Sequence, residues 1–62
     1  MTRHFTTSTG ARGISRSFRR YVVVDRYDTS TQYRTDVLDR ARKVARQYGS
    51  WEVIDLDAGR SV

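Results

Sequence analysis

The sequence predicts a small α+β module in which one helix packs on one face of a three-stranded sheet, in the order ββαβ. Three observations support this fold class. Residues 35–49 carry apolar side chains at steps of three and four, which is the period of an amphipathic helix. Residues 18–27 and 51–57 are short runs rich in β-branched and aromatic residues, which are typical of strands. A chain of 62 residues allows a single domain with a small core.

The N-terminal segment is the candidate for the first strand. Phe5 is followed by two threonines, and residues 10–13 (GARG) are typical of a turn because glycine accepts positive φ values. This pattern predicts a hairpin, with one strand near residues 3–8 and the next beginning near Ile14. The Thr, Ser, Arg and Gly content of residues 1–13 also fits a flexible basic arm, so both interpretations stay open.

Residues 18–27 (FRRYVVVDRY) are the best strand of the chain. Three consecutive valines lie between aromatic residues, so the centre is apolar on both faces while the ends are polar. That pattern predicts a central strand. Residues 28–31 (DTST) are turn-forming and cap-forming types, and we expect them to end the strand.

Residues 35–49 (TDVLDRARKVARQYG) are the predicted helix. Thr35 is a favourable N-cap, and Gly49 stands where a left-handed C-cap belongs. Asp36 and Asp39 lie in the first turn, spaced to pair with basic residues four positions later. The apolar stripe consists of Val37, Leu38, Ala41, Val44, Ala45 and Tyr48. A stripe of this width predicts that the helix covers one face of a sheet.

Residues 51–57 (WEVIDLD) predict the last strand, and residues 58–62 a frayed polar tail. Strand, helix and strand with short connections predict a parallel βαβ unit with a right-handed crossover. One helix covers only one face of the sheet, so we expect the opposite face to be bare. The exposed set is then either Tyr21, Val23 and Tyr27 or Phe18, Val22 and Val24. An exposed apolar patch of this kind usually marks an interface.

The chain is basic, with a net charge of +5 that comes from eleven arginines and one lysine. Basic residues with aromatic residues among them are typical of nucleic-acid binding, in which charge follows phosphate and rings stack on bases. The alternatives are a solvated helix face and the codon bias of a GC-rich genome. The candidate partner-binding or nucleic-acid-binding residues are Arg12, Arg16, Phe18, Arg19, Arg20, Tyr21, Tyr27, Arg42, Lys43 and Arg46.

Catalytic chemistry has little support in the sequence. If the two long strands are parallel neighbours, Asp25, Asp55 and Asp57 gather at one sheet edge, as the Mg²⁺ site of a metal-dependent nuclease requires. The other interpretation is that these aspartates only solubilise the strand ends. The absence of cysteine and the single histidine leave no disulfide and no zinc cage. We therefore expect a protein that is not an enzyme and has no cofactor or metal.

The expected setting follows from what the sequence lacks. No apolar run approaches the roughly 18 residues of a membrane span, and the N-terminus does not resemble a secretory signal. We therefore expect a cytoplasmic protein with no membrane partner. A chain this small often needs a further stabiliser, which predicts a protein partner, either a host protein or a second copy in a homodimer.

Two resemblances bear on function. The run YVVVDRYDTS, followed by an Arg-rich helix ending in VARQYG and another strand, is similar to the first half of the small CRISPR-associated nucleases. That resemblance implies a metal-binding role for Asp25 or Asp28, and the second half of the family's ferredoxin-like fold has no counterpart here. Over nearly its whole length the chain resembles small ββαβ bacteriophage accessory and inhibitor proteins, which implies docking on a host protein without chemistry.

Two functions follow from these observations. The first is a small non-enzymatic binding protein, a phage-type adaptor or inhibitor that docks on a host protein through the bare sheet face or the helix. The second is a basic nucleic-acid-binding module that places its arginine clusters on DNA or RNA. A metal-dependent nuclease is the third interpretation.

Overall fold

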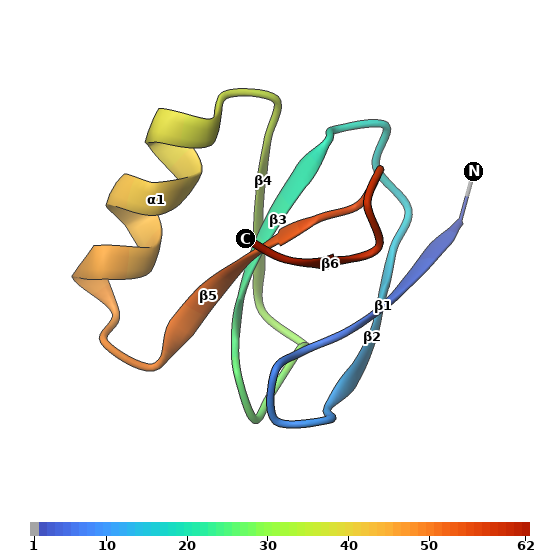
Figure 1. The fold of residues 1–62 in the computed structure, drawn as a ribbon, viewed down its shortest axis with the longest axis horizontal. Coiled ribbons are helices and arrows are strands. Elements are labelled where there is room, and N and C mark those ends of the chain that lie inside the picture. The colour runs from blue at the N-terminus through green and yellow to red at the C-terminus, as the bar shows by residue number, and fades with distance from the viewer. Residues whose placement is uncertain (1) are drawn as a thin grey trace.

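The computed structural model describes residues 2–62, which form one helix and six strands in two antiparallel sheets. The α+β class is therefore confirmed. The smaller sheet is a hairpin of β1 (Arg3–Thr6) and β2 (Arg12–Ser15). The larger sheet has the order β4-β3-β5-β6 and consists of β3 (Tyr21–Asp25), β4 (Gln32–Thr35), β5 (Trp51–Asp55) and β6 (Arg60–Ser61). The helix α1 (Leu38–Gln47) connects β4 to β5 (Figure 1).

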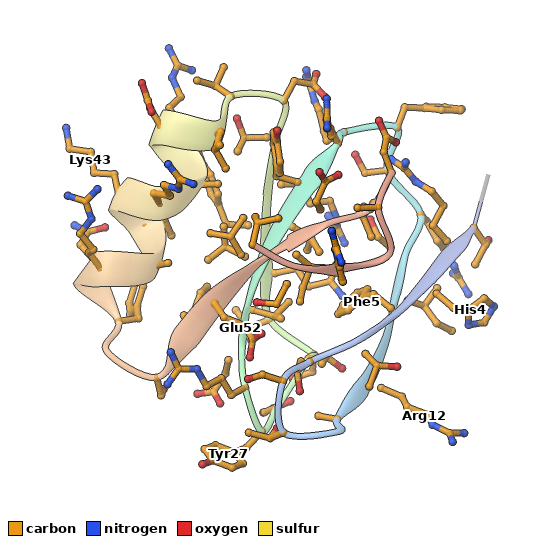
Figure 2. The ribbon with its side chains drawn as sticks, in the orientation of Figure 1. His4, Phe5, Arg12, Tyr27, Lys43 and Glu52 are labelled. Atoms are coloured by element: carbon orange, nitrogen blue, oxygen red, sulfur yellow. The ribbon has the colours of Figure 1, made fainter. Side chains whose placement is uncertain are left out.

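The larger sheet lies between the helix and the hairpin, so both of its faces are covered (Figure 1). The core on the helix side consists of Tyr21, Val23, Ala41 and Val53, and the core on the hairpin side of Phe5, Val22, Val24, Ile54 and Leu56. The prediction of a bare sheet face is wrong. The N-terminal strands do not extend the sheet at its edge. They form a separate sheet that packs across the open face, with Phe5 pointing inward (Figure 2).

Phe5 and Gly13 explain how closely the hairpin packs. The two residues are opposite each other in the β1–β2 ladder, and the Phe5 ring lies across Gly13. A Cβ at this position would stand 2.7 Å from Cε2 of the ring and 2.8 Å from Cβ of Thr29, so only glycine fits. The turn lies earlier than predicted: Gly10 has φ of 91° and donates its N–H to the Thr7 carbonyl at 3.0 Å. The N-terminal segment thus has the hairpin of the first interpretation.

The direction of the β3–β5 pair corrects the predicted βαβ unit. β3 and β5 are antiparallel neighbours, with Asp25 opposite Trp51 and Tyr21 opposite Asp55. The cause is β4, which consists of residues 32–34, for which the sequence predicts no element, and the expected N-cap Thr35, and which reverses the chain once more before the helix. Asp25 and Asp55 therefore lie at opposite ends of the ladder, and the predicted gathering of carboxylates does not occur. Within residues 2–62 no group of three potential metal-ligating side chains is present.

The helix is shorter than predicted at both ends. Thr35 is not the N-cap, because it is the last residue of β4 and the N-cap of the helix is Val37. The buried hydroxyl of Thr35 accepts a hydrogen bond from the Val37 N–H at 3.1 Å. Gly49 is not a left-handed C-cap, since Gly10 and Gly59 are the positive-φ residues of the described chain. The stripe residues that pack on the sheet are Leu38, Ala41, Val44 and Ala45. No helix within residues 2–62 has the length and apolar character needed to cross a membrane.

The C-terminal residues end in a strand where the sequence predicts fraying. Gly59, with φ of 73°, donates its N–H to the Asp55 carbonyl at 2.7 Å and turns the chain back. Arg60 and Ser61 then pair with β5 as β6.

Candidate functional site

Arg19 and Arg20, two of the predicted binding residues, are held in ion pairs. Arg19 lies 2.8 Å from Asp36, and Arg20 lies 3.1 Å from Asp55. The hydrogen bond from Arg19 lowers the pKa of Asp36, and the one from Arg20 lowers the pKa of Asp55. The Arg20 guanidinium also lies 5.3 Å from the ring centroid of Tyr21, which is buried. The charge of both arginines is therefore offset within the molecule.

Two further ion pairs lie where the hairpin meets the larger sheet. Arg3 is 2.9 Å from Asp57, and Arg26 is 3.7 Å from Glu52. Glu52 is buried and accepts hydrogen bonds from the N–H and the hydroxyl of Ser8, at 3.2 and 2.7 Å. These contacts join the hairpin turn to β5, and they occupy two more carboxylates.

The remaining cationic side chains have no carboxylate within 4.0 Å among the described residues. They are Arg12, Arg16, Arg34, Arg40, Arg42, Lys43, Arg46 and Arg60. Lys43 points away from the sheet on the outer side of α1 (Figure 2). Four of these side chains belong to α1, and Arg60 belongs to β6. Several of the eight line one of two grooves on the surface, which are described next.

The first groove has a volume of about 500 Å³ and lies between α1, the start of the β3–β4 loop and the hairpin turn. We call it the aromatic groove, and its charged and aromatic lining is Arg26, Tyr27, Arg42, Arg46, Trp51 and Glu52. Arg42 and Arg46 are one turn apart on α1, so their side chains reach the same wall. Tyr27 is 76% exposed, and the Trp51 ring stacks on Tyr48 with the ring centroids 4.5 Å apart. Trp51 is half-buried and also packs against the core on the helix side. The groove therefore offers the exposed ring of Tyr27 and the half-buried ring of Trp51 beside the guanidinium groups of Arg42 and Arg46.

The second groove has a volume of about 440 Å³ and involves β2, β4 and the β3–β4 loop. We call it the hairpin groove, and it is lined by Arg12, Gly13, Ile14, Arg16, Thr29, Ser30, Gln32 and Arg34. None of these described lining residues is acidic. Side chains join its two walls, because Gln32 Nε2 donates to the Ile14 carbonyl at 2.9 Å and the Thr29 hydroxyl donates to the Arg12 carbonyl at 2.8 Å.

The β3–β4 loop, residues 26–31, contributes to both grooves. Its first two residues line the aromatic groove, while Thr29 lines the hairpin groove. Asp25 fixes the start of this loop, since its carboxylate accepts hydrogen bonds from the Tyr27 N–H at 2.8 Å and from the Ser50 hydroxyl at 2.9 Å. The exposed Tyr27 ring is thus presented from an ordered backbone.

The structure divides the predicted binding residues among several surfaces. Tyr27, Arg42 and Arg46 line the aromatic groove, and Arg12 and Arg16 line the hairpin groove. Outside both linings are Phe18, Arg19, Arg20, Tyr21 and Lys43. Sequence reasoning missed Arg26, Arg34 and Trp51. The signal for Trp51 is its position three residues after Tyr48, at the end of an apolar stripe. Arg34 carried no comparable signal, because no strand was expected in its segment.

Comparison of the chain with protein-family models, curated proteins and solved structures found no match. The two resemblances of the sequence analysis therefore stay predictions. Function has to be inferred from the surfaces described above. These surfaces offer guanidinium groups, which bind anions, and aromatic faces, which bind planar groups.

Proposed function

We propose that this protein is a non-enzymatic module that binds single-stranded nucleic acid in the aromatic groove. The proposal is carried by the position of Arg42 and Arg46, which have no carboxylate partner in the described chain and line the same groove as two aromatic rings. The arginines hold phosphates, and Trp51 and Tyr27 stack on bases. Stacking of a base on an aromatic side chain contributes about 1–3 kcal/mol and tolerates any sequence.

A single strand suits this groove better than a duplex. Within a duplex the base faces are stacked on one another, so aromatic side chains in a groove have no free face to contact. An unpaired strand presents its bases and its phosphates together. Arginine also stacks on bases in addition to binding phosphate, so Arg42 and Arg46 serve either part of the nucleotide.

The covered sheet removes the main support for docking on a host protein. Docking through a bare sheet face requires apolar side chains on an exposed face of the central strand. The apolar residues of β3 are Tyr21, Val22, Val23 and Val24, and all of them are buried. The unpaired positive charge, by contrast, lies on the surface. A nucleic-acid ligand is therefore the function that we place first.

Trp51 supplies a direct test, because it is the only tryptophan of the chain and it lines the groove. We expect single-stranded DNA or RNA to quench Trp51 emission at low salt, and a duplex of the same sequence to quench it less. The affinity should fall with salt, with log K decreasing by about 0.7 per phosphate contact and log unit of salt. If neither single-stranded DNA nor single-stranded RNA changes the Trp51 fluorescence or its anisotropy at low salt, the proposal is wrong. Capture of a protein partner that survives nuclease treatment would then favour docking.

A pair of double variants locates the site. Arg42→Ala/Arg46→Ala should abolish most of the quenching and make the salt dependence shallower by roughly 1.4 in log–log slope. Arg40→Ala/Lys43→Ala is the matched control, because it removes the same charge from the same helix outside the groove lining. Equal weakening by both double variants would mean that only net charge matters and that the aromatic groove is not the site.

A further inference from the structure

The hairpin groove gathers three arginines from two different sheets. Arg12 in β2 and Arg16 just after it lie on the outer face of the hairpin, because side chains alternate along a strand and Ser15 is buried on the inner face. Arg34 in β4 is opposite Val22, so it lies on the side of the larger sheet that faces the hairpin. All three side chains are exposed to solvent and line the same groove.

Within the described lining, no carboxylate offsets this charge. Asp28 precedes the lining residue Thr29 but is not part of the lining, and its carboxylate, which accepts a hydrogen bond from the Ser30 N–H at 3.0 Å, makes no ion pair in the described chain. Three like charges around one groove repel each other, and an anionic ligand relieves that repulsion. The planar guanidinium group matches two phosphate oxygens at once, which makes phosphate the ligand class that three arginines favour.

An apolar side chain stands between the arginines. Ile14 is 44% exposed and lies between Arg12 and Arg16 on the outer face of the hairpin. A free phosphate ion gains nothing from contact with an apolar side chain, whereas the sugar of a nucleotide can pack against one. The groove therefore fits a phosphate that belongs to a nucleotide chain better than inorganic phosphate.

The β3–β4 loop brings the two grooves next to each other. Tyr27 lines the aromatic groove and Thr29 the hairpin groove, and two residues of chain span at most about 7 Å. Tyr27 and Arg12 lie at the same end of the molecule in Figure 2. The distance between the linings is thus within reach of a short nucleotide strand.

We propose that a single strand seated in the aromatic groove continues across the β3–β4 loop into the hairpin groove, where Arg12, Arg16 and Arg34 bind its phosphates. The inference rests on the proposed function and extends it. The ligand is then a strand of several nucleotides that is held by base stacking in one groove and by backbone charge in the other.

The experiment compares oligonucleotides of about 4 and about 12 nucleotides, which lie within the range of common single-strand site sizes. The triple variant Arg12→Ala/Arg16→Ala/Arg34→Ala should bind the shorter strand as the unchanged protein does, with full Trp51 quenching. For the longer strand its log–log salt slope should be shallower by roughly 2, so a fourfold rise in salt should weaken the unchanged protein roughly 20-fold more than the variant. None of the three side chains makes an ion pair in the described chain, so the variant should melt as the unchanged protein does.

A second triple variant separates the possible failures. Arg40→Ala/Lys43→Ala/Arg60→Ala removes the same charge from positions outside both linings. If the two triple variants bind the longer strand alike, the hairpin groove makes no contact of its own and the inference is wrong while the proposed function stands. If the unchanged protein binds neither strand, the proposed function and the inference built on it both fail.

Discussion

Phe5 is the side chain with which the hairpin closes the larger sheet, so its truncation tests the packing on which both grooves depend. Phe5 is 4% exposed, and its core neighbours are Val22, Val24, Ile54 and Leu56. Replacing a buried phenylalanine by alanine costs about 3–5 kcal/mol. The whole stability of a 62-residue domain is roughly 3–9 kcal/mol. We therefore expect Phe5→Ala to remove at least about a third of the free energy of unfolding.

Urea and thermal unfolding, followed by Trp51 fluorescence and far-UV circular dichroism, would measure this loss. Because each kcal/mol shifts the melting temperature of a small domain by about 4–8 °C, we expect a fall of more than about 12 °C. The control is Ile14→Ala, which truncates an apolar side chain that is 44% exposed on the outer face of the same hairpin and should change stability by about 0.5 kcal/mol or less. If Phe5→Ala and Ile14→Ala have the same melting temperature and urea midpoint, the hairpin does not stabilise the core on the hairpin side of the larger sheet.

Two further variants test local features of the fold. Gly13→Ala should destabilise the protein by about 1–3 kcal/mol in urea unfolding, because the new Cβ would stand 2.8 Å from Cβ of Thr29 and closer still to the Phe5 ring. Gly49→Ala is the control, since a Cβ there would meet open space. Equal stabilities of the two variants would contradict the close packing at Gly13. Asp55→Asn should make the free energy of unfolding depend less on pH in the acid range. The arginine partner of Asp55 holds the pKa of its carboxyl below the ordinary 3.8, so the pair contributes fully above that value and is lost as the pH falls through the lowered pKa. Urea midpoints at neutral and acid pH measure the effect, and Asp39→Asn is the control. If both variants lose stability equally as the pH falls, the role of the Arg20–Asp55 pair is contradicted.

The parts of the fold that could be predicted are those with a local period. The stripe of the helix recurs every three to four residues, and the three valines of β3 mark a buried strand by themselves. β4 has the sequence QYRT and lies at a sheet edge, so neither its length nor its polarity separates it from a turn. That single omission reverses the expected direction of β5, because whether two distant strands run parallel depends on how often the chain turns between them.

The candidate site was predictable to the same limited extent. Arg42 and Arg46 were identified because their positions on the outside of a helix follow from its period. The same local patterns cannot show that Arg19 and Arg20 are paired, since their partners Asp36 and Asp55 stand far along the chain. An ion pair between distant residues leaves no trace in either local sequence. The predicted residues therefore included arginines whose charge is already offset by the fold.

The apolar character of β3 on both faces has a consequence for how the strand finds its register. In most sheets a slip of one residue would place polar side chains in the core, and this penalty fixes the alignment. After a slip of one residue the inner positions of β3 would still hold valine, so there the hydrophobic pattern discriminates weakly. At the ends, the slip would carry Arg20 or Asp25 into the buried position of Tyr21 or Val24. The choice between alignments therefore depends on the residues at the ends of β3, where Arg20 forms an ion pair with Asp55 and Asp25 accepts a hydrogen bond from the Ser50 hydroxyl. A slip would break these contacts and bury a charged side chain, so the charged ends of β3, rather than its valines, select the alignment of the central strand.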